Sequence, residues 1–134
     1  ITSFANDKKL DKKIEEKVEI ENYYVCNVLG MKPVATISLK IDGVRYEQTS
    51  SGDGQYDAFM KALHKIYDQR KVAIPKLEDY VVTIPPGGKT DALVETVITW
   101  NDGTRSFKTR GLDLDQTSAA IKATRKMLNI IEMQ

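Results

Sequence analysis

Between residues 34 and 41 every second residue is apolar, and polar residues fill most of the positions between them. This alternation is typical of a strand with one buried face. Asp42 and Gly43 follow, and this pair favours a tight hairpin turn because glycine accepts positive φ. The sequence therefore predicts a strand over residues 34–41, a turn, and a return strand over residues 44–48.

The rest of the first half supplies one more strand and one helix. Residues 23–29 form a largely apolar stretch that ends at Gly30, which predicts a strand. A glycine-containing loop at residues 50–54 precedes apolar residues that recur at helical spacing. We therefore predict a helix over residues 55–69, with an inward face of Ala58, Phe59, Ala62, Leu63 and Ile66.

The same order of elements recurs in the second half of the chain. Its predicted elements are strands over residues 78–84, 94–100 and 104–109, a turn at 101–103, a loop over 111–115 and a helix over 116–131. Two prolines and two glycines at residues 85–88 end the first of these strands. The inward face of the helix is predicted to hold Ala120, Ala123, Met127, Ile130 and Ile131.

The two halves form an internal repeat. Asp42-Gly43 matches Asp102-Gly103 at an offset of 60 residues, whereas the helices match at an offset of 61. We interpret the difference as one extra residue in the second glycine loop. The alternation also has a different phase relative to the turn in the second half, and a β-bulge would reconcile the two phases.

The elements predict an α+β fold of two βββα units related by a pseudo-two-fold, with helices packed on antiparallel sheets. The predicted units cover residues 20–70 and 76–134. Residues 1–19 are rich in charge, with Leu10, Ile14 and Val18 at a spacing of four. A short exposed helix and a solvated linker both fit that pattern.

Composition excludes several classes of function. The 134 residues carry a net charge of +1, which gives no electrostatic argument for nucleic acid or an anionic membrane. No apolar run is long enough to span a bilayer. The single Cys26 and single His64 exclude zinc frameworks built from several cysteines and histidines, and we expect a buried thiol and a surface imidazole. One cysteine suits a cytoplasmic protein. The chain begins without Met, so we interpret it as part of a longer protein.

The glycine loops before the two helices are the best candidates for chemistry. A helix start presents unpaired N–H groups and a partial positive charge, which favour a carboxylate or a phosphate. Asp53 or Asp57 beside the first helix start could hold a cation, so the loop suits a free amino acid. The same residues also suit ordinary turns and helix caps. No catalytic motif such as His-x-His or Gly-x-Ser-x-Gly occurs, and we predict no catalytic residues in this domain.

The residues at these loops resemble a known family. Residues 51–63, which read Ser-Gly-Asp-Gly-Gln-Tyr-Asp-Ala-Phe-Met-Lys-Ala-Leu, resemble the Gly-x-Gly-Pro-Val-Asp-Ala…Lys-Ala segment of a regulatory domain. This is the C-terminal allosteric and dimerisation domain of 2-isopropylmalate synthases and citramalate synthases. Residues 109–123 resemble its second loop and helix. Gln55-Tyr56 stands where Pro-Val is usual, which resembles the citramalate-synthase side.

This resemblance implies a function for the whole protein. The complete enzyme would be an acetyl-CoA-condensing transferase whose missing catalytic barrel binds a divalent metal, while this domain needs no cofactor. The domain would form a homodimer and bind leucine or isoleucine, giving feedback inhibition in branched-chain amino-acid biosynthesis. No nucleic-acid or membrane partner is implied.

Carried over by position, the resemblance also implies the effector-binding residues. They are Gly52, Gly54, Tyr56, Asp57, Leu77, Tyr80, Ile84, Val94, Leu114 and Gln116. The apolar members suit a branched side chain, and Asp57 with the helix N–H groups suits the zwitterion. Each apolar residue alone would equally suit a plain core.

Three alternatives stay open at this point. The parent enzyme could be a 2-isopropylmalate synthase sensing leucine or a citramalate synthase sensing isoleucine. Three strands followed by a helix also resemble a double-stranded-RNA-binding domain, in which Lys122, Arg125 and Lys126 would meet phosphates. The third alternative is a dimerisation module without a ligand.

Overall fold

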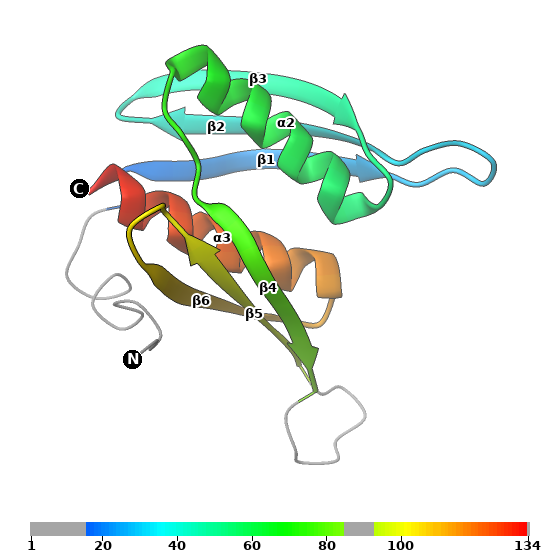
Figure 1. Cartoon of the computed structure of the whole chain (residues 1–134). Coiled ribbons are helices and arrows are strands. Elements are labelled where there is room, and N and C mark those ends of the chain that lie inside the picture. The colour runs from blue at the N-terminus through cyan, green and yellow to red at the C-terminus, as the bar shows by residue number, and fades with distance from the viewer. Residues whose placement is uncertain (1–15, 85–92, 134) are drawn as a thin grey trace. The chain divides into compact units, whose positions relative to one another are not determined.

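A computed structural model of the chain describes residues 16–84 and 93–133. Six strands and two helices follow in the order β1 (Val18–Cys26), β2 (Val34–Ile41), β3 (Val44–Ser51), α2 (Gln55–Arg70), β4 (Lys76–Thr83), β5 (Val94–Asn101), β6 (Ser106–Asp113) and α3 (Gln116–Glu132). The predicted α+β fold of two βββα units is confirmed (Figure 1). Within this described part, neither helix is long and apolar enough to cross a membrane.

The chain divides into two compact units, of which one comprises Lys17–Ile74 and the other includes Pro75–Gln134. We call them the N-terminal and the C-terminal unit. The short helix or linker predicted over residues 1–19 lies outside the described residues apart from its end, where Val18 begins β1. The proline–glycine stop at residues 85–88 also lies outside them.

In the N-terminal unit, β1, β2 and β3 form an antiparallel sheet in that order. Helix α2 packs mainly over β2 and β3, on one face of the sheet (Figure 1). Beneath it the central strand β2 buries Ala35, Ile37, Leu39 and Ile41, the residues that the alternation predicts. The five residues predicted for the inward face of this helix are all buried.

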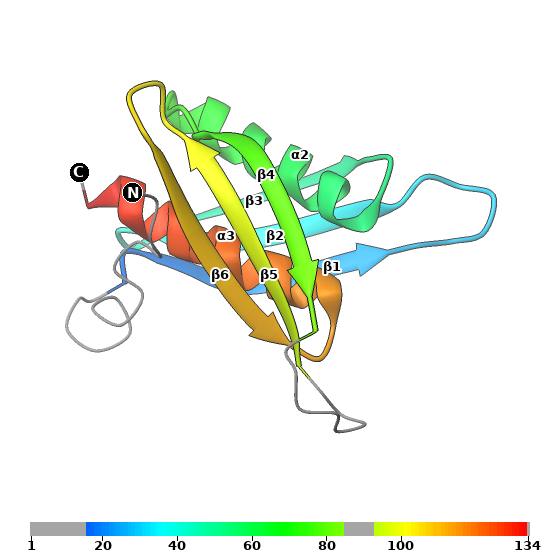
Figure 2. The same ribbon diagram turned by 60° about the horizontal axis from the view of Figure 1, so that its bottom comes forward.

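In the C-terminal unit, β4, β5 and β6 form the matching sheet, and α3 packs over β5 and β6. Figure 2 shows this sheet face-on, with α3 behind β5 and β6. The core contains Ile98, Trp100 and Phe107 together with a buried polar chain. The Thr109 hydroxyl accepts a hydrogen bond from Trp100 Nε1 at 2.9 Å and donates one to the Ala123 carbonyl at 2.8 Å.

Strand pairing corrects the predicted alignment of the repeat. Leu39 pairs with Tyr46 as Trp100 pairs with Phe107, and the helices start at Gln55 and Gln116, so every offset from β2 onwards is 61. The second glycine loop therefore holds no extra residue, and neither the β2–β3 pair nor the β5–β6 pair contains a bulge.

The Asp-Gly match at 60 misleads because the two hairpins use different turns. Asp42 and Gly43 both have positive φ, as a type I′ turn requires. The equivalent positions in the C-terminal unit are Gly103 and Thr104, of which only Gly103 has positive φ. The glycine occupies the second turn position in the N-terminal unit and the first in the C-terminal unit. The pairing of the flanking strands is nevertheless the same in both units.

The bulges lie instead in the first strand of each unit. Glu21 is the extra residue in β1 and Glu78 in β4, so these strands match at an offset of 57. Seven residues separate Cys26 from Val34, whereas eleven separate their equivalents Thr83 and Glu95. The four-residue difference in offset therefore arises in the loop after the first strand.

Several predicted boundaries shift by one to three residues, and two differences are informative. Strand β1 begins at Val18, five residues before the predicted start, because its Glu19, Glu21 and Asn22 are exposed polar positions that hide the strand pattern. Gly111 belongs to β6 rather than to a loop. A Cβ there would lie 2.1 Å from the Ala119 carbonyl oxygen, so glycine permits α3 to rest directly on the strand.

Candidate functional site

The start of α2 gathers four of the predicted site residues. Gly54 is the N-cap, in an extended conformation and without a side-chain cap, and Tyr56 and Asp57 lie in the first turn. Gly52 is buried against that turn, since a Cβ there would lie 2.4 Å from the Ala58 nitrogen. Glycine at this position therefore sets how closely β3 approaches the helix start.

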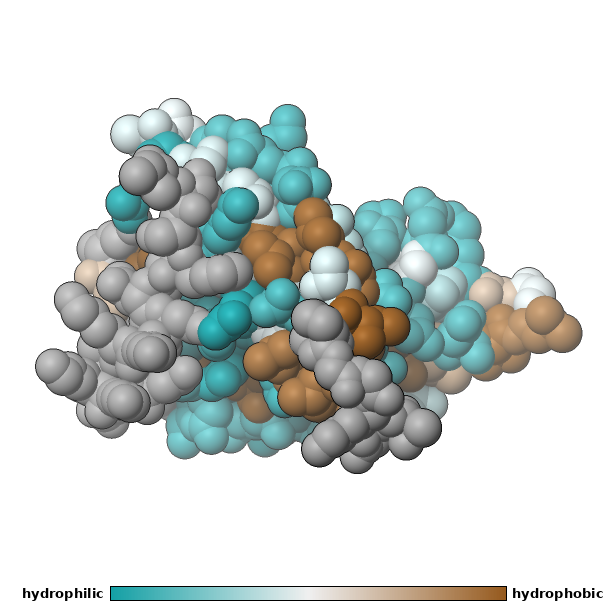
Figure 3. Space-filling view, turned by 90° about the horizontal axis from the view of Figure 1, so that it is seen from below, coloured by the Kyte–Doolittle hydropathy of each residue, from teal (hydrophilic) through white to brown (hydrophobic). Residues whose placement is uncertain are grey.

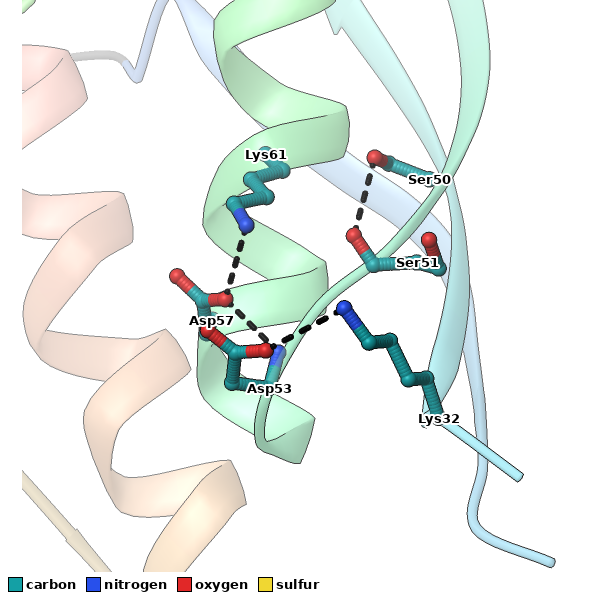
Figure 4. A network of polar contacts seen from close by, with 6 residues as sticks. All are labelled: Lys32, Ser50, Ser51, Asp53, Asp57 and Lys61. Carbon is teal, nitrogen blue, oxygen red and sulfur yellow. Dashed lines mark hydrogen bonds and ion pairs between the residues drawn. The ribbon is translucent and has the colours of Figure 1, made fainter.

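Asp57 is held in a network of charges at this helix start (Figure 4). Its Oδ2 accepts a hydrogen bond from the Asp53 N–H at 2.8 Å and lies 3.2 Å from Lys61 Nζ. Asp53 pairs with Lys32 from the loop after β1 at 3.5 Å. The Asp53 N–H, and then Lys61 and Lys32, lower the pKa of Asp57, although slight burial opposes them. Asp57 is therefore ionised, with the Asp53 N–H and Lys61 as its partners.

An aromatic cluster lies beside this network. Tyr56 stacks on Phe59 with ring centroids 6.2 Å apart, and Tyr23 meets Phe59 edge-on at 6.1 Å. Phe59 is buried, whereas Tyr23 is 38% exposed. Tyr23 is not among the predicted site residues, although the 57-residue offset makes it the equivalent of the predicted Tyr80.

In the C-terminal unit, the helix-facing side of β4 is open. Tyr80 and Val82 share this side with Ile98 and Thr96 of β5, but α3 covers β5 and β6 rather than β4. Exposed apolar side chains at the nearby strand ends include Ile84, Leu93 and Leu114. Figure 3 shows apolar surface on the side of the molecule toward which these strand ends point. The open strip has the chemistry to hold a branched aliphatic group.

Polar groups border the strip at the start of α3. The Tyr80 hydroxyl interacts with the side chains of Gln116 and Thr96. Burial raises the pKa of Tyr80, and these hydrogen bonds partly oppose the rise. Within the described chain the wholly buried Thr96 hydroxyl meets no partner at full hydrogen-bond geometry, so its interaction with Tyr80 is weak.

The structure brings most of the other predicted residues to this end of the unit. Ile84 follows β4, Val94 begins β5, Leu114 precedes α3 and Gln116 is its first residue. Leu77 lies elsewhere, because it pairs with Trp100, six residues along β5 from Val94. That separation is about 20 Å along an extended strand.

The carboxylates before α3 accept hydrogen bonds from backbone N–H groups. Asp115 is the N-cap and accepts from the Ser118 N–H at 2.8 Å. Asp113 accepts from the Asp115 N–H and pairs with Lys122 at 2.9 Å, and these contacts lower its pKa in that order. No group of three potential metal ligands occurs in the described parts of the chain. His64 is exposed, as expected, but Cys26 is half-buried rather than buried.

Comparison with known proteins identifies the domain. Residues 1–132 match the family model of the LeuA allosteric (dimerisation) domain. The chain belongs to this family. The order of two βββα units and the glycine-flanked helix start at Gln55 are therefore features of a LeuA allosteric domain.

Curated relatives of this LeuA domain are synthases. The chain is 36% identical to 2-isopropylmalate synthase of Aquifex aeolicus over 116 residues, which cover 85% of the chain and 21% of the relative. It is 31% identical to (R)-citramalate synthase CimA of Methanocaldococcus jannaschii over 122 residues, covering 90% of the chain and 24% of the relative. The chain thus spans about a quarter of the curated relatives that it matches, in their C-terminal part.

Proposed function

We propose that this chain is a homodimeric, amino-acid-sensing domain that binds leucine or isoleucine and mediates feedback inhibition of a 2-isopropylmalate synthase. One observation carries the proposal. In a chain of the LeuA allosteric family, the open side of β4 places apolar side chains next to the polar start of α3.

Taken unit by unit, the chemistry of these residues suits a branched-chain amino acid. In the N-terminal unit, the uncapped start of α2 attracts a carboxylate and the ionised Asp57 suits an ammonium group. In the C-terminal unit, Val82, Ile84 and Val94 offer the apolar surface that a branched side chain needs. Leucine and isoleucine differ only in the position of one methyl, which a pocket discriminates by about 1–3 kcal/mol. Both therefore belong to the proposal.

The parent enzyme is also part of the proposal. The relatives named 2-isopropylmalate synthase support a leucine-sensing parent, and those named citramalate synthase support an isoleucine-sensing one. In either case the acetyl-CoA-condensing transferase activity and its divalent metal would belong to a separate catalytic barrel. As a biosynthetic enzyme the protein would be cytoplasmic.

Titration calorimetry of the chain with leucine, isoleucine and valine tests the proposal, with sedimentation to establish the dimer. We expect saturable binding of leucine or isoleucine and weaker binding of valine. Asp57→Asn should weaken binding at least tenfold, because it removes the charge opposite the ammonium group. Glu47→Gln removes an exposed carboxylate from β3 and should change nothing. A folded dimer that binds none of the three amino acids would contradict the proposal.

A further inference from the structure

Thr96 has a buried hydroxyl that the fold does not need. It lies in the central strand β5, between Val82 of β4 and Gly111 of β6. Its side chain is wholly buried, yet no described residue gives its oxygen a full hydrogen bond. The equivalent residue of the N-terminal unit, at the 61-residue offset, is Ala35, which is equally buried. The βββα unit therefore folds without a hydroxyl at this row.

Thr109 shows what a structural threonine does in the same core. It faces α3 from β6, and its hydroxyl both accepts from Trp100 and donates to the Ala123 carbonyl. A buried hydroxyl without such partners typically costs about 1–3 kcal/mol. Valine would fill the space of Thr96 without that cost. Thr96 is thus a buried polar group whose presence the packing leaves unexplained.

The group facing Thr96 belongs to the proposed effector site. The Tyr80 hydroxyl interacts with Gln116 and weakly with Thr96. Gln116 is exposed at the first position of α3, where its side-chain amide can meet a ligand. Tyr80 therefore lies between a buried oxygen that lacks a partner and an exposed amide that a ligand can engage.

We infer that Thr96 is a positioning residue of the effector site, which takes up the Tyr80 hydrogen bond when an amino acid engages Gln116. The inference rests on the proposed function. In the ligand-bound state the Tyr80 hydroxyl donates fully to Thr96 Oγ1, and the Gln116 amide is released toward the ligand. Binding thereby satisfies a buried oxygen, so part of the affinity comes from a hydrogen bond beneath the ligand.

Calorimetry with leucine and isoleucine on matched variants tests this inference. Thr96→Val keeps the shape and removes the hydroxyl, and should weaken binding at least tenfold without loss of folding. Thr96→Ser keeps the hydroxyl and should bind within about threefold of the wild type. Thr99→Val removes a threonine hydroxyl from the opposite face of β5 and should leave affinity unchanged.

A double-mutant cycle measures whether Thr96 and Tyr80 are coupled in ligand affinity. A purely structural role of Thr96 would not produce that coupling. If Thr96 acts through Tyr80, Thr96→Val should have no further effect on affinity once Tyr80→Phe is present. Additive losses, or wild-type affinity in Thr96→Val, would overturn this inference while leaving the proposed function intact. Failure of the wild type to bind any branched-chain amino acid would overturn both.

Discussion

The two βββα units place side chains on the same rows but fill their central strands differently. Under its helix, β2 presents Ala35, Ile37 and Leu39, which are all apolar. The equivalent residues of β5 are Thr96, Ile98 and Trp100, and two of these carry polar atoms. The C-terminal unit therefore keeps buried polar chemistry that the N-terminal unit shows to be unnecessary for folding. Of the two residues, Thr96 lies two residues from Val94, at the end of the unit where most of its predicted effector residues gather.

The two helix starts also differ, and here the C-terminal unit has the better satisfied hydrogen bonds. α3 begins with an aspartate cap whose side chain already accepts a backbone N–H, whereas α2 begins at an uncapped glycine. Asp57 reaches back to the Asp53 N–H instead. The cap thus stabilises the start of α3, whereas the glycines at the start of α2 allow β3 and the helix to approach closely.

The largest expected effect comes from Gly111, where the helix rests on the strand. Gly111→Ala places a Cβ 2.1 Å from the Ala119 carbonyl oxygen, a backbone atom that cannot move alone. We expect a loss of about 3 kcal/mol in the free energy of unfolding. Ser50→Ala, at the equivalent position of β3, should cost almost nothing. Urea denaturation of both variants checks the contrast, and equal effects would show that the two helices approach their sheets alike.

The buried threonines of the C-terminal unit should respond differently to loss of the hydroxyl. Thr109→Val leaves Trp100 Nε1 and the Ala123 carbonyl without their partner, so it should cost about 2 kcal/mol. Thr96→Val should leave unfolding unchanged or slightly stabilise the ligand-free chain. A comparable loss in both variants would mean that Thr96 has a structural hydrogen bond after all. Chemical denaturation without ligand measures both.

The caps should give a smaller contrast. Asp115→Ala removes the acceptor of the Ser118 N–H and should cost about 1 kcal/mol. Gly54→Ser supplies the cap that α2 lacks, in open space, and should stabilise by a few tenths of a kcal/mol. Thermal melts report both changes. A stability gain accompanied by weaker amino-acid binding would show that the uncapped start serves the ligand.

Acid pH should produce the smallest change in the free energy of unfolding. Asp57, Asp113 and Glu78 have lowered pKa values in the folded chain, owing first to the Asp53 N–H, the Asp115 N–H and Asn101, respectively. Such groups stabilise the fold above their unfolded pKa values, near 4, and that contribution disappears as pH falls through the folded values. Unfolding measured from pH 6 to pH 2 should show this decline. Asp57→Asn should flatten it, whereas a profile unchanged in Asp57→Asn would remove Asp57 from the set.

Most of the fold follows from local sequence pattern. The alternation in β2 and the helical spacing after Gly54 predict the N-terminal core, because each reports one buried face. Strand β1 was only half predicted, since most of its residues face solvent. The Asp-Gly match predicts the wrong alignment of the two units, because this pair marks a turn without fixing which turn position the glycine occupies. Only the strand pairing shows that equivalent residues of the two units keep a constant offset of 61 from β2 onwards.

The candidate site was less accessible to sequence reasoning. The family resemblance supplied Tyr80, Asp57 and Gln116. The alternation of Ile98 and Trp100 puts Thr96 on the inward face of β5, but it does not show that the Thr96 hydroxyl lacks a hydrogen-bond partner. Its importance appears only when burial, missing partners and the alanine of the other unit are considered together. Leu77 illustrates the converse, because the bulge at Glu78 and the length of β4 set it far from Val94.

The unequal lengths of the segments after β1 and β4 identify a place where the chain tolerates insertion. The repeat absorbed a four-residue length change at this place while every row of the sheets kept its partner. In the shorter copy, Gly30 is exposed with open space around it, at the tip of a structured turn. A fluorescent reporter inserted there would leave both cores intact. Lys32 of the same loop contacts Asp53 at the start of α2. Amino-acid binding at that helix start should therefore change the fluorescence of the reporter.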